Sequence, residues 1–215
     1  MTTLNHQQQA QMVALQRAVE RLRAVDLTAR CAALGLHSPS GQSLGLRAFG
    51  QDLCLTLPDF TATRVDGKPV RLTDHLLVLH YLLCDLPLSP TGQMINFRDL
   101  AGGQFYFGPF SSRTTRPLVN RIGNNLDLLR ANLGRFDTPP CNAGVLPAVG
   151  PAETPPLALS VRIHALGRID MTLLYHGGDE EGPPTAELLF DACIKRVFAT
   201  EDVAVLASRI CLGLL

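Results

Sequence analysis

The sequence has no excess of charge of either sign. Its 215 residues include 19 lysines and arginines and 19 aspartates and glutamates, so the formal net charge at pH 7 is zero. Proteins that bind nucleic acid neutralise its phosphates with a basic face, and this composition therefore argues against a nucleic-acid partner. A protein without net charge has little colloidal repulsion, which leaves room for a homo-oligomer.

The sequence also lacks long apolar runs. No stretch reaches the roughly 20 residues that a membrane-spanning helix needs, and we expect no membrane partner. The first residues, Met1 to Gln9, have neither the basic region nor the apolar region of a signal peptide. Together these features favour a cytoplasmic protein.

Clusters of cysteine are missing as well. The six cysteines are scattered singly, with no C-x-x-C pair: Cys31, Cys54, Cys84, Cys141, Cys193 and Cys211. This spacing argues against a zinc ribbon, and we expect no iron–sulfur cluster. In a chain of this length it favours reduced thiols, most of them small core residues, over a disulfide framework.

Two helices are predicted at the start of the chain. Apolar residues recur at three- and four-residue steps over residues 6–24, which is typical of an amphipathic helix. Asp26 is typical of the N-cap of a second, short helix that ends at Gly35. We assign residues 1–36 to an N-terminal amphipathic helical segment, which either packs on the following domain or binds a partner.

A hairpin and a buried helix are expected next. Apolar residues alternate on both sides of Gly50-Gln51, a pattern typical of two antiparallel strands. Residues 74–84 would place apolar side chains on nearly every face of a helix, which indicates a central, buried helix. We expect Thr73 to be its N-cap. His80 lies inside this helix and is either a hydrogen-bonded core histidine or a ligand or acid–base group.

Further helices and a long loop are predicted in the second half. Residues 111–122 and 124–134 have helical patterns divided at Gly123, and a proline-rich loop follows at 137–156. We expect Thr200 to cap a final amphipathic helix.

Three strands complete the predicted architecture. Apolar residues alternate over 157–163 and 169–175, and 186–190 is a further strand candidate. The sequence therefore predicts, for residues 37–215, a single α+β domain. It has a mainly antiparallel sheet, a central buried helix and flanking N- and C-terminal helices.

The densest cluster of groups that could do chemistry lies in the acidic loop at 178–191. Its glycines and prolines can hold carboxylates where ordinary strand geometry would not put them. Alternation along an extended segment predicts that Asp179 and Glu181 face inward while Glu180 faces water. Asp191 closes the segment.

Two functions are compatible with this pattern. The first is a binding or accessory protein for an unknown small molecule or protein, with its site around the His80 helix and the 178–191 loop. The candidate ligand-binding residues are His80, Phe97, Arg98, Asp179, Glu181 and Asp191. The alternative is a metal-dependent enzyme in which Asp179, Glu181 and Asp191 hold a divalent metal, because carboxylate oxygens suit magnesium, calcium or manganese. Arg98 either meets an acidic group of a ligand or pairs with Asp179 or Asp191 in the fold.

Several short motifs together resemble one known family. They are Leu79-His-Tyr-Leu-Leu83, Thr91-Gly-Gln-Met-Ile-Asn-Phe-Arg-Asp-Leu-Ala-Gly-Gly103, Gly178-Asp-Glu-Glu181 and Leu189-Phe-Asp191 followed by the helix that contains Glu201. In this order they resemble the domain of unknown function DUF3786, over roughly residues 45 to 212. The resemblance implies a protein of anaerobic bacteria or archaea, and some relatives carry an extra iron–sulfur domain. The family brings no activity, but it supports the choice of candidate residues.

Overall fold

The computed structural model describes residues 6–36, 41–136, 158–180 and 182–215. It confirms an α+β architecture built on a mainly antiparallel sheet. The proline-rich loop at 137–156 lies outside the described residues, as does Glu181. The division of the chain at residue 36 stays a prediction.

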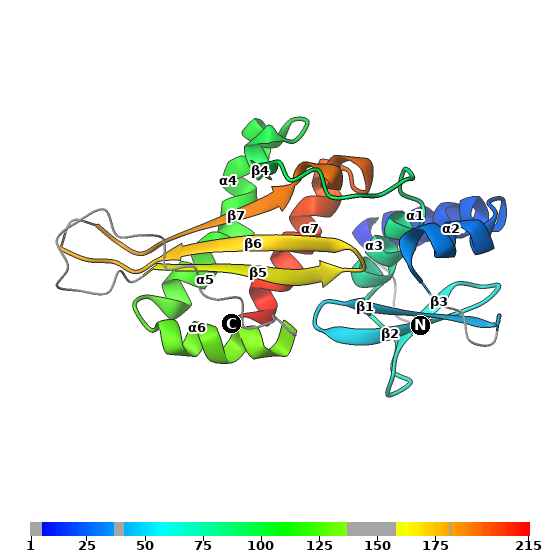
Figure 1. The fold of residues 1–215 in the computed structure, drawn as a ribbon, viewed down its shortest axis with the longest axis horizontal. Coiled ribbons are helices and arrows are strands. Elements are labelled where there is room, and N and C mark those ends of the chain that lie inside the picture. Colours follow the sequence, from blue (N-terminus) through cyan, green and yellow to red (C-terminus); the bar gives the residue numbers. More distant parts are fainter. Residues whose placement is uncertain (1–5, 37–40, 137–157, 181) are drawn as a thin grey trace.

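The sheet has seven strands in the order β3-β2-β1-β5-β6-β7-β4. The strands are β1 (Ser43–Ala48), β2 (Gln51–Thr56), β3 (Thr61–Arg64), β4 (Met94–Asn96), β5 (Ala158–Leu166), β6 (Ile169–His176) and β7 (Thr185–Asp191). The ladder between β1 and β5 consists of a single residue pair, Ala48 and Leu166, so the sheet has two parts joined at one point. Figure 1 shows β1–β3 with α1–α3 at one end of the molecule and β5–β7 with α4–α6 at the other.

The β1–β2 hairpin turns at Phe49-Gly50, one residue earlier than the sequence suggests. Both residues have positive φ, 54° and 76°, as a type I′ turn requires. The Phe49 side chain is buried, and its backbone N–H donates to the Ala165 carbonyl of β5. The turn thus fastens the smaller part of the sheet to the larger one.

The two N-terminal helices form as the sequence predicts. They are α1 (His6–Arg23) and α2 (Leu27–Leu34). Asp26 caps α2 by accepting a hydrogen bond from the Ala29 N–H, and Gly35 ends it in the left-handed conformation. The Arg30 side chain donates to the Leu82 and Cys84 carbonyls at the end of the next helix, which ties α2 to it.

The buried central helix is confirmed, but its ends differ from the prediction. It is α3 (Leu72–Leu82), with Leu77, Val78, Leu79 and Tyr81 in the core. The helix begins directly after the extended residue Arg71, so Thr73 already lies in the first turn and cannot cap it. The prediction of Thr73 as the cap is therefore wrong.

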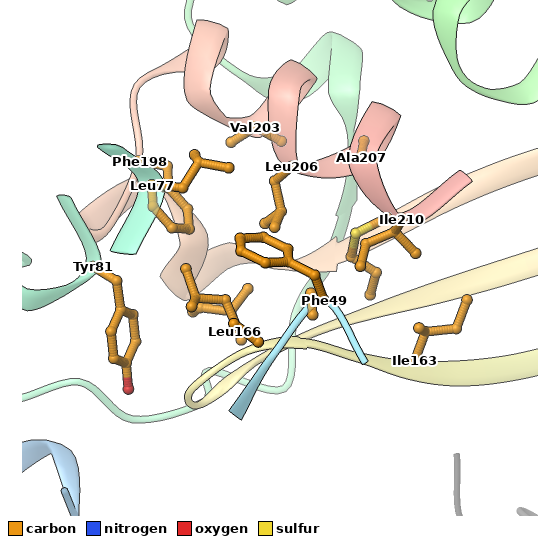
Figure 2. Packing of buried hydrophobic residues seen from close by; sticks show 14 of the residues in the cluster. Phe49, Leu77, Tyr81, Ile163, Leu166, Phe198, Val203, Leu206, Ala207 and Ile210 are labelled. Carbon is orange, nitrogen blue, oxygen red and sulfur yellow. The ribbon is translucent and has the colours of Figure 1, made fainter. Parts of the chain in front are cut away.

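The final helix, α7 (Thr200–Gly213), is amphipathic as predicted. Figure 2 shows Val203, Leu206, Ala207 and Ile210 on its buried side, with Leu206 pointing toward Phe49. The cap, however, is Ala199, because the Thr200 hydroxyl donates instead to the Ala101 carbonyl. The prediction of Thr200 as the cap is wrong.

The middle of the chain contains one helix that the sequence pattern does not predict. It is α4 (Gly103–Arg113), followed by α5 (Thr115–Ile122) and α6 (Leu126–Leu133); short 3-10 turns lie at Phe97–Asp99 (η1), Gly134–Phe136 (η2) and Ala192–Arg196 (η3). Gly103 lies so close to the Phe97 carbonyl that no Cβ would fit. This contact positions α4 against η1 at the start of the cavity described below.

Candidate functional site

His80 forms a polar pair with Asp202 between α3 and α7. Its Nδ1 lies 2.8 Å from a carboxylate oxygen of Asp202, and the two side chains are 29% and 19% exposed. The pair joins the C-terminal part of α3 to the first turn of α7. His80 thus has a hydrogen-bonding partner within the fold.

Asp191 holds a loop closed. Its carboxylate accepts hydrogen bonds from the N–H groups of Thr91, Gly92 and Cys193 and from the Thr91 hydroxyl. Burial raises the pKa of this carboxyl, but the hydrogen bonds from Cys193 and Thr91 lower it more, leaving the pKa well below its usual range. All these contacts keep the 91–93 segment against the end of β7.

The acidic loop lies at the opposite end of β7. Asp179 is exposed, and its Oδ1 accepts from the Gly182 N–H at 3.0 Å. Glu180 is exposed as expected. The inward orientation expected for Asp179 is therefore wrong, and that expected for Glu181 falls outside the described residues.

Phe97 and Arg98 lie in η1 and contact aromatic rings of α4. Phe97 is buried and stacks on Phe110 with ring centroids 3.9 Å apart. The Arg98 guanidinium lies 3.7 Å from the Phe107 ring centroid, a favourable cation–π geometry. Because Arg98 has this aromatic partner and no acidic one among the described residues, its expected pairing with Asp179 or Asp191 is wrong.

The five candidate residues that the structure describes do not gather in one place. Asp179 precedes β7 and Asp191 ends it, and the six other residues of this extended strand lie between them, a length of roughly 20 Å at about 3.3 Å per residue. Two carboxylates at that separation cannot share one metal ion. Among the described residues no group of three or more histidine, cysteine, aspartate or glutamate side chains is arranged to hold a metal.

Two buried thiols, Cys193 and Cys211, are poor nucleophiles. Burial, followed by the hydrogen bond to Asp191, raises the pKa of Cys193 to about 12. Burial alone raises the pKa of Cys211 to about 12. Because the thiolate is the reactive form, these residues serve the core as neutral thiols.

A cavity of about 530 Å³ opens where α3, α4 and α7 meet. It is lined by Arg71, Thr73, Asp74, Phe97, Tyr106, Pro109, Phe110, Arg113, Thr200, Glu201, Ala204, Val205, Ser208, Arg209 and Leu212. Of the five sequence-selected residues within the described part of the chain, Phe97 alone is among them. The cavity does involve the helix that carries His80, but at its other end.

The outer face of α7 forms one wall. Glu201, Ala204, Val205, Ser208 and Leu212 recur at helical spacing, opposite the buried stripe of the same helix. Tyr106 of α4 is 59% exposed beside the same cavity. The walls are therefore largely apolar and aromatic, as is usual for pockets that bind small molecules.

An ion pair with a buried carboxylate lies in the lining. Asp74 is only 2% exposed, and its Oδ2 accepts from Arg209 Nε at 3.0 Å. The Arg209 guanidinium also lies 5.6 Å from the Phe49 ring centroid. A buried charge is retained only where it is paired, and this pair joins the first turn of α3 to the second half of α7.

The lining carries more positive than negative charge. Arg71, Arg113 and Arg209 face two acids, Asp74 and Glu201. The two hydroxyl groups from α7 are committed to backbone carbonyls: Thr200 donates to Ala101 and Ser208 to Arg113. The arginines are thus the groups that can meet an anionic ligand.

No described helix is both long and apolar enough to cross a membrane. Comparison with family models gives one match, the domain of unknown function DUF3786, over residues 26–212. The chain belongs to the DUF3786 family. No curated protein and no solved structure shows a significant match to it.

The DUF3786 match includes the whole cavity. All lining residues fall between Arg71 and Leu212, inside the matched stretch, whereas α1 precedes it. The cavity is therefore built from the domain that defines the family.

Sequence reasoning missed Asp74 and Arg209. Both are charged residues within helices whose other residues are mainly apolar. A charge at a position that helical periodicity predicts to be buried is the signal that could have selected them. Their pairing across 135 residues of sequence was not visible in any motif.

Proposed function

We propose that this protein binds a small molecule in the cavity between α3, α4 and α7. The observation that carries the proposal is the Asp74–Arg209 ion pair, with its buried carboxylate, set in a largely apolar and aromatic lining. Pockets that bind small molecules combine apolar walls with a few placed polar groups that fix the ligand's orientation. The cavity, at about 530 Å³, has the size typical of such pockets.

The lining favours a ligand with an apolar ring and an anionic group. Phe110, Tyr106 and Leu212 offer surface to a ring. The excess of arginine favours an anionic group, because a guanidinium binds a carboxylate or phosphate through two parallel hydrogen bonds. We therefore propose a binding site at the N-terminal end of the helix that carries His80, in place of one at His80 or the acidic loop.

We propose further that the protein acts in the cytoplasm. Its five described cysteines are free thiols, and free thiols are usual in a reducing compartment. A role as an accessory protein that holds its ligand for a partner is compatible with such a site.

Blocking the cavity tests this function. Ala204 lines it, so Ala204→Phe should fill part of the space that a ligand needs. The probes are L-phenylalanine, L-tryptophan, 3-phenylpropionate and indole-3-acetate. Saturation at 100 times Kd adds about 2.7 kcal/mol to stability, which corresponds to a rise in Tm of roughly 5–10 °C for a chain of this size.

At least one probe should raise the Tm of the natural protein, and Ala204→Phe should abolish the rise. The matched control is Val65→Phe, which adds the same ring at a position that is 77% exposed and outside the cavity lining. It should keep the full rise. An equal rise in both variants, or no rise with any probe in the natural protein, would contradict the proposal.

A further inference from the structure

The Asp74–Arg209 pair leaves one carboxylate oxygen without a partner. Asp74 Oδ1 is buried and accepts no hydrogen bond from any described residue. A buried polar atom left unsatisfied is uncommon and costs free energy. Because Asp74 is a residue of the cavity lining, a ligand that brings a hydrogen-bond donor would satisfy this acceptor.

The same pair leaves donors free beside that acceptor. Arg209 contacts Asp74 through Nε alone, although a guanidinium and a carboxylate can form two parallel hydrogen bonds. Within the described part of the chain its two Nη nitrogens donate to nothing. A carboxylate acceptor and guanidinium donors therefore lie next to each other in the lining.

We infer that the ligand is an α-amino acid with an aromatic side chain, an inference that rests on the function proposed above. Its ammonium group donates to Asp74 Oδ1, and its carboxylate accepts from the free nitrogens of Arg209. Both charged groups of an amino acid lie on one carbon, which matches the adjacency of acceptor and donors in this pair.

The rest of the lining supports this ligand class. Arg71 and Arg113 add positive charge for the carboxylate, and Glu201 adds negative charge for the ammonium. The ring has Phe110 and the exposed face of Tyr106 to pack against. A ligand with a carboxylate alone would leave Asp74 Oδ1 unsatisfied, and this is the basis for discrimination.

Matched ligands test the inference by isothermal titration calorimetry on the natural protein. L-phenylalanine is compared with 3-phenylpropionate, which lacks the ammonium, and with phenethylamine, which lacks the carboxylate. L-phenylalanine should bind about tenfold or more tightly than either analogue, because a site built to hydrogen-bond a group rejects ligands without it. Binding of 3-phenylpropionate within twofold of L-phenylalanine would overturn the inference while leaving the proposed function intact.

Failure of all three compounds to bind would overturn this inference. Binding of indole-3-acetate that Ala204→Phe abolishes would then still uphold the proposed function.

A variant tests whether Asp74 is the group that binds the ammonium of the ligand. Asp74→Asn should reduce the preference for L-phenylalanine over 3-phenylpropionate to about one, because a neutral amide lacks the charge that attracts an ammonium. The control is Asp127→Asn, an exposed carboxylate on α6 outside the lining, which should keep the preference. An unchanged preference in folded Asp74→Asn would overturn the inference. If circular dichroism shows that this variant does not fold, the comparison of ligands on the natural protein decides alone.

Discussion

Single side chains hold distant parts of this chain together. His80 and Asp202 are 122 residues apart in sequence, and Asp191 and Thr91 are 100 apart. Each contact joins a helix or strand end to another element. We therefore expect His80 and Asp191, two of the candidates selected from the sequence, to contribute to the free energy of unfolding.

The His80–Asp202 pair should contribute more than an exposed ion pair does. A double-mutant cycle with His80→Ala and Asp202→Ala should give a coupling free energy of about 1 kcal/mol, because both side chains are mostly buried and the hydrogen bond involves a charged group. Urea denaturation of the four proteins measures it. The matched control is Asp127–Arg130, whose contact is 2.9 Å but whose side chains are 92% and 55% exposed. This pair should show no measurable coupling. Equal coupling in the two pairs would contradict the prediction.

Asp191 should make stability depend on acid pH. Its folded pKa lies below its usual value, so between about pH 4 and the folded pKa the unfolded chain binds a proton that the native protein does not. The stabilisation by Asp191 is therefore fully present above about pH 5 and is lost as the pH falls through the folded pKa.

The Asp191→Asn variant tests this dependence. Near neutral pH it should unfold about 1–2 kcal/mol more easily than the natural protein, since several hydrogen bonds lose their charged acceptor. Below about pH 4 the difference in free energy of unfolding between the two proteins should shrink. Urea titrations at a series of pH values measure it, and a difference that stays constant down to pH 2 would contradict the assignment.

At the scale of elements, α3 and α7 run antiparallel and are joined near both ends by polar pairs. Asp74 contacts Arg209 and His80 contacts Asp202, so positions rise along one helix as they fall along the other. Between these pairs the buried residues of the two helices meet the core, as Figure 2 shows for Leu77 and Leu206. The two pairs therefore fix the position of α7 relative to α3, and both helices line the cavity.

The β5–β6 turn should tolerate only glycine at its tip. Gly167 has φ of +58°, and a Cβ there would meet the Tyr81 ring of α3. Gly167→Ala should cost roughly 2–4 kcal/mol, the sum of left-handed strain and overpacking. Gly67→Ala is the matched control, with φ of +77° and open space around it, and should cost only about 1 kcal/mol. Thermal or urea denaturation measures the loss of stability in each variant. Equal losses would contradict the prediction, because they would mean that the Tyr81 ring moves aside without a cost in free energy.

Strands β5 and β6 and the ends of α2 could be predicted because local patterns determine them, whereas the sequence pattern does not predict the short strands β3 and β4. Alternation along 157–163 and 169–175 matches the buried and exposed faces of β5 and β6, and Asp26 and Gly35 act through their own backbone neighbours. Helix α4 could not be predicted in this way, since it contains Gly103, Gly108 and Pro109, all poor helix formers. Its packing of Phe110 on Phe97 overrides that propensity.

At the scale of the whole molecule, the candidate site could not be predicted because it depends on which helix ends meet. The acidic loop was selected because its charged groups are adjacent in sequence, yet strand β7 carries Asp179 away from Asp191. The cavity draws on α3, η1, α4 and α7, which span residues 71 to 212. Asp74 and Arg209 become a pair only once the sheet has brought those helices together.

The separation between sheet and cavity has an evolutionary consequence. Every lining residue belongs to α3 and its N-cap, η1, α4 or α7, and the inner faces of α3 and α7 carry the core instead. Substitutions on the outward faces, such as at Ala204, Val205 or Leu212, change the shape of the cavity without altering strand register. Related proteins can thus diversify in what they recognise while inheriting the same scaffold.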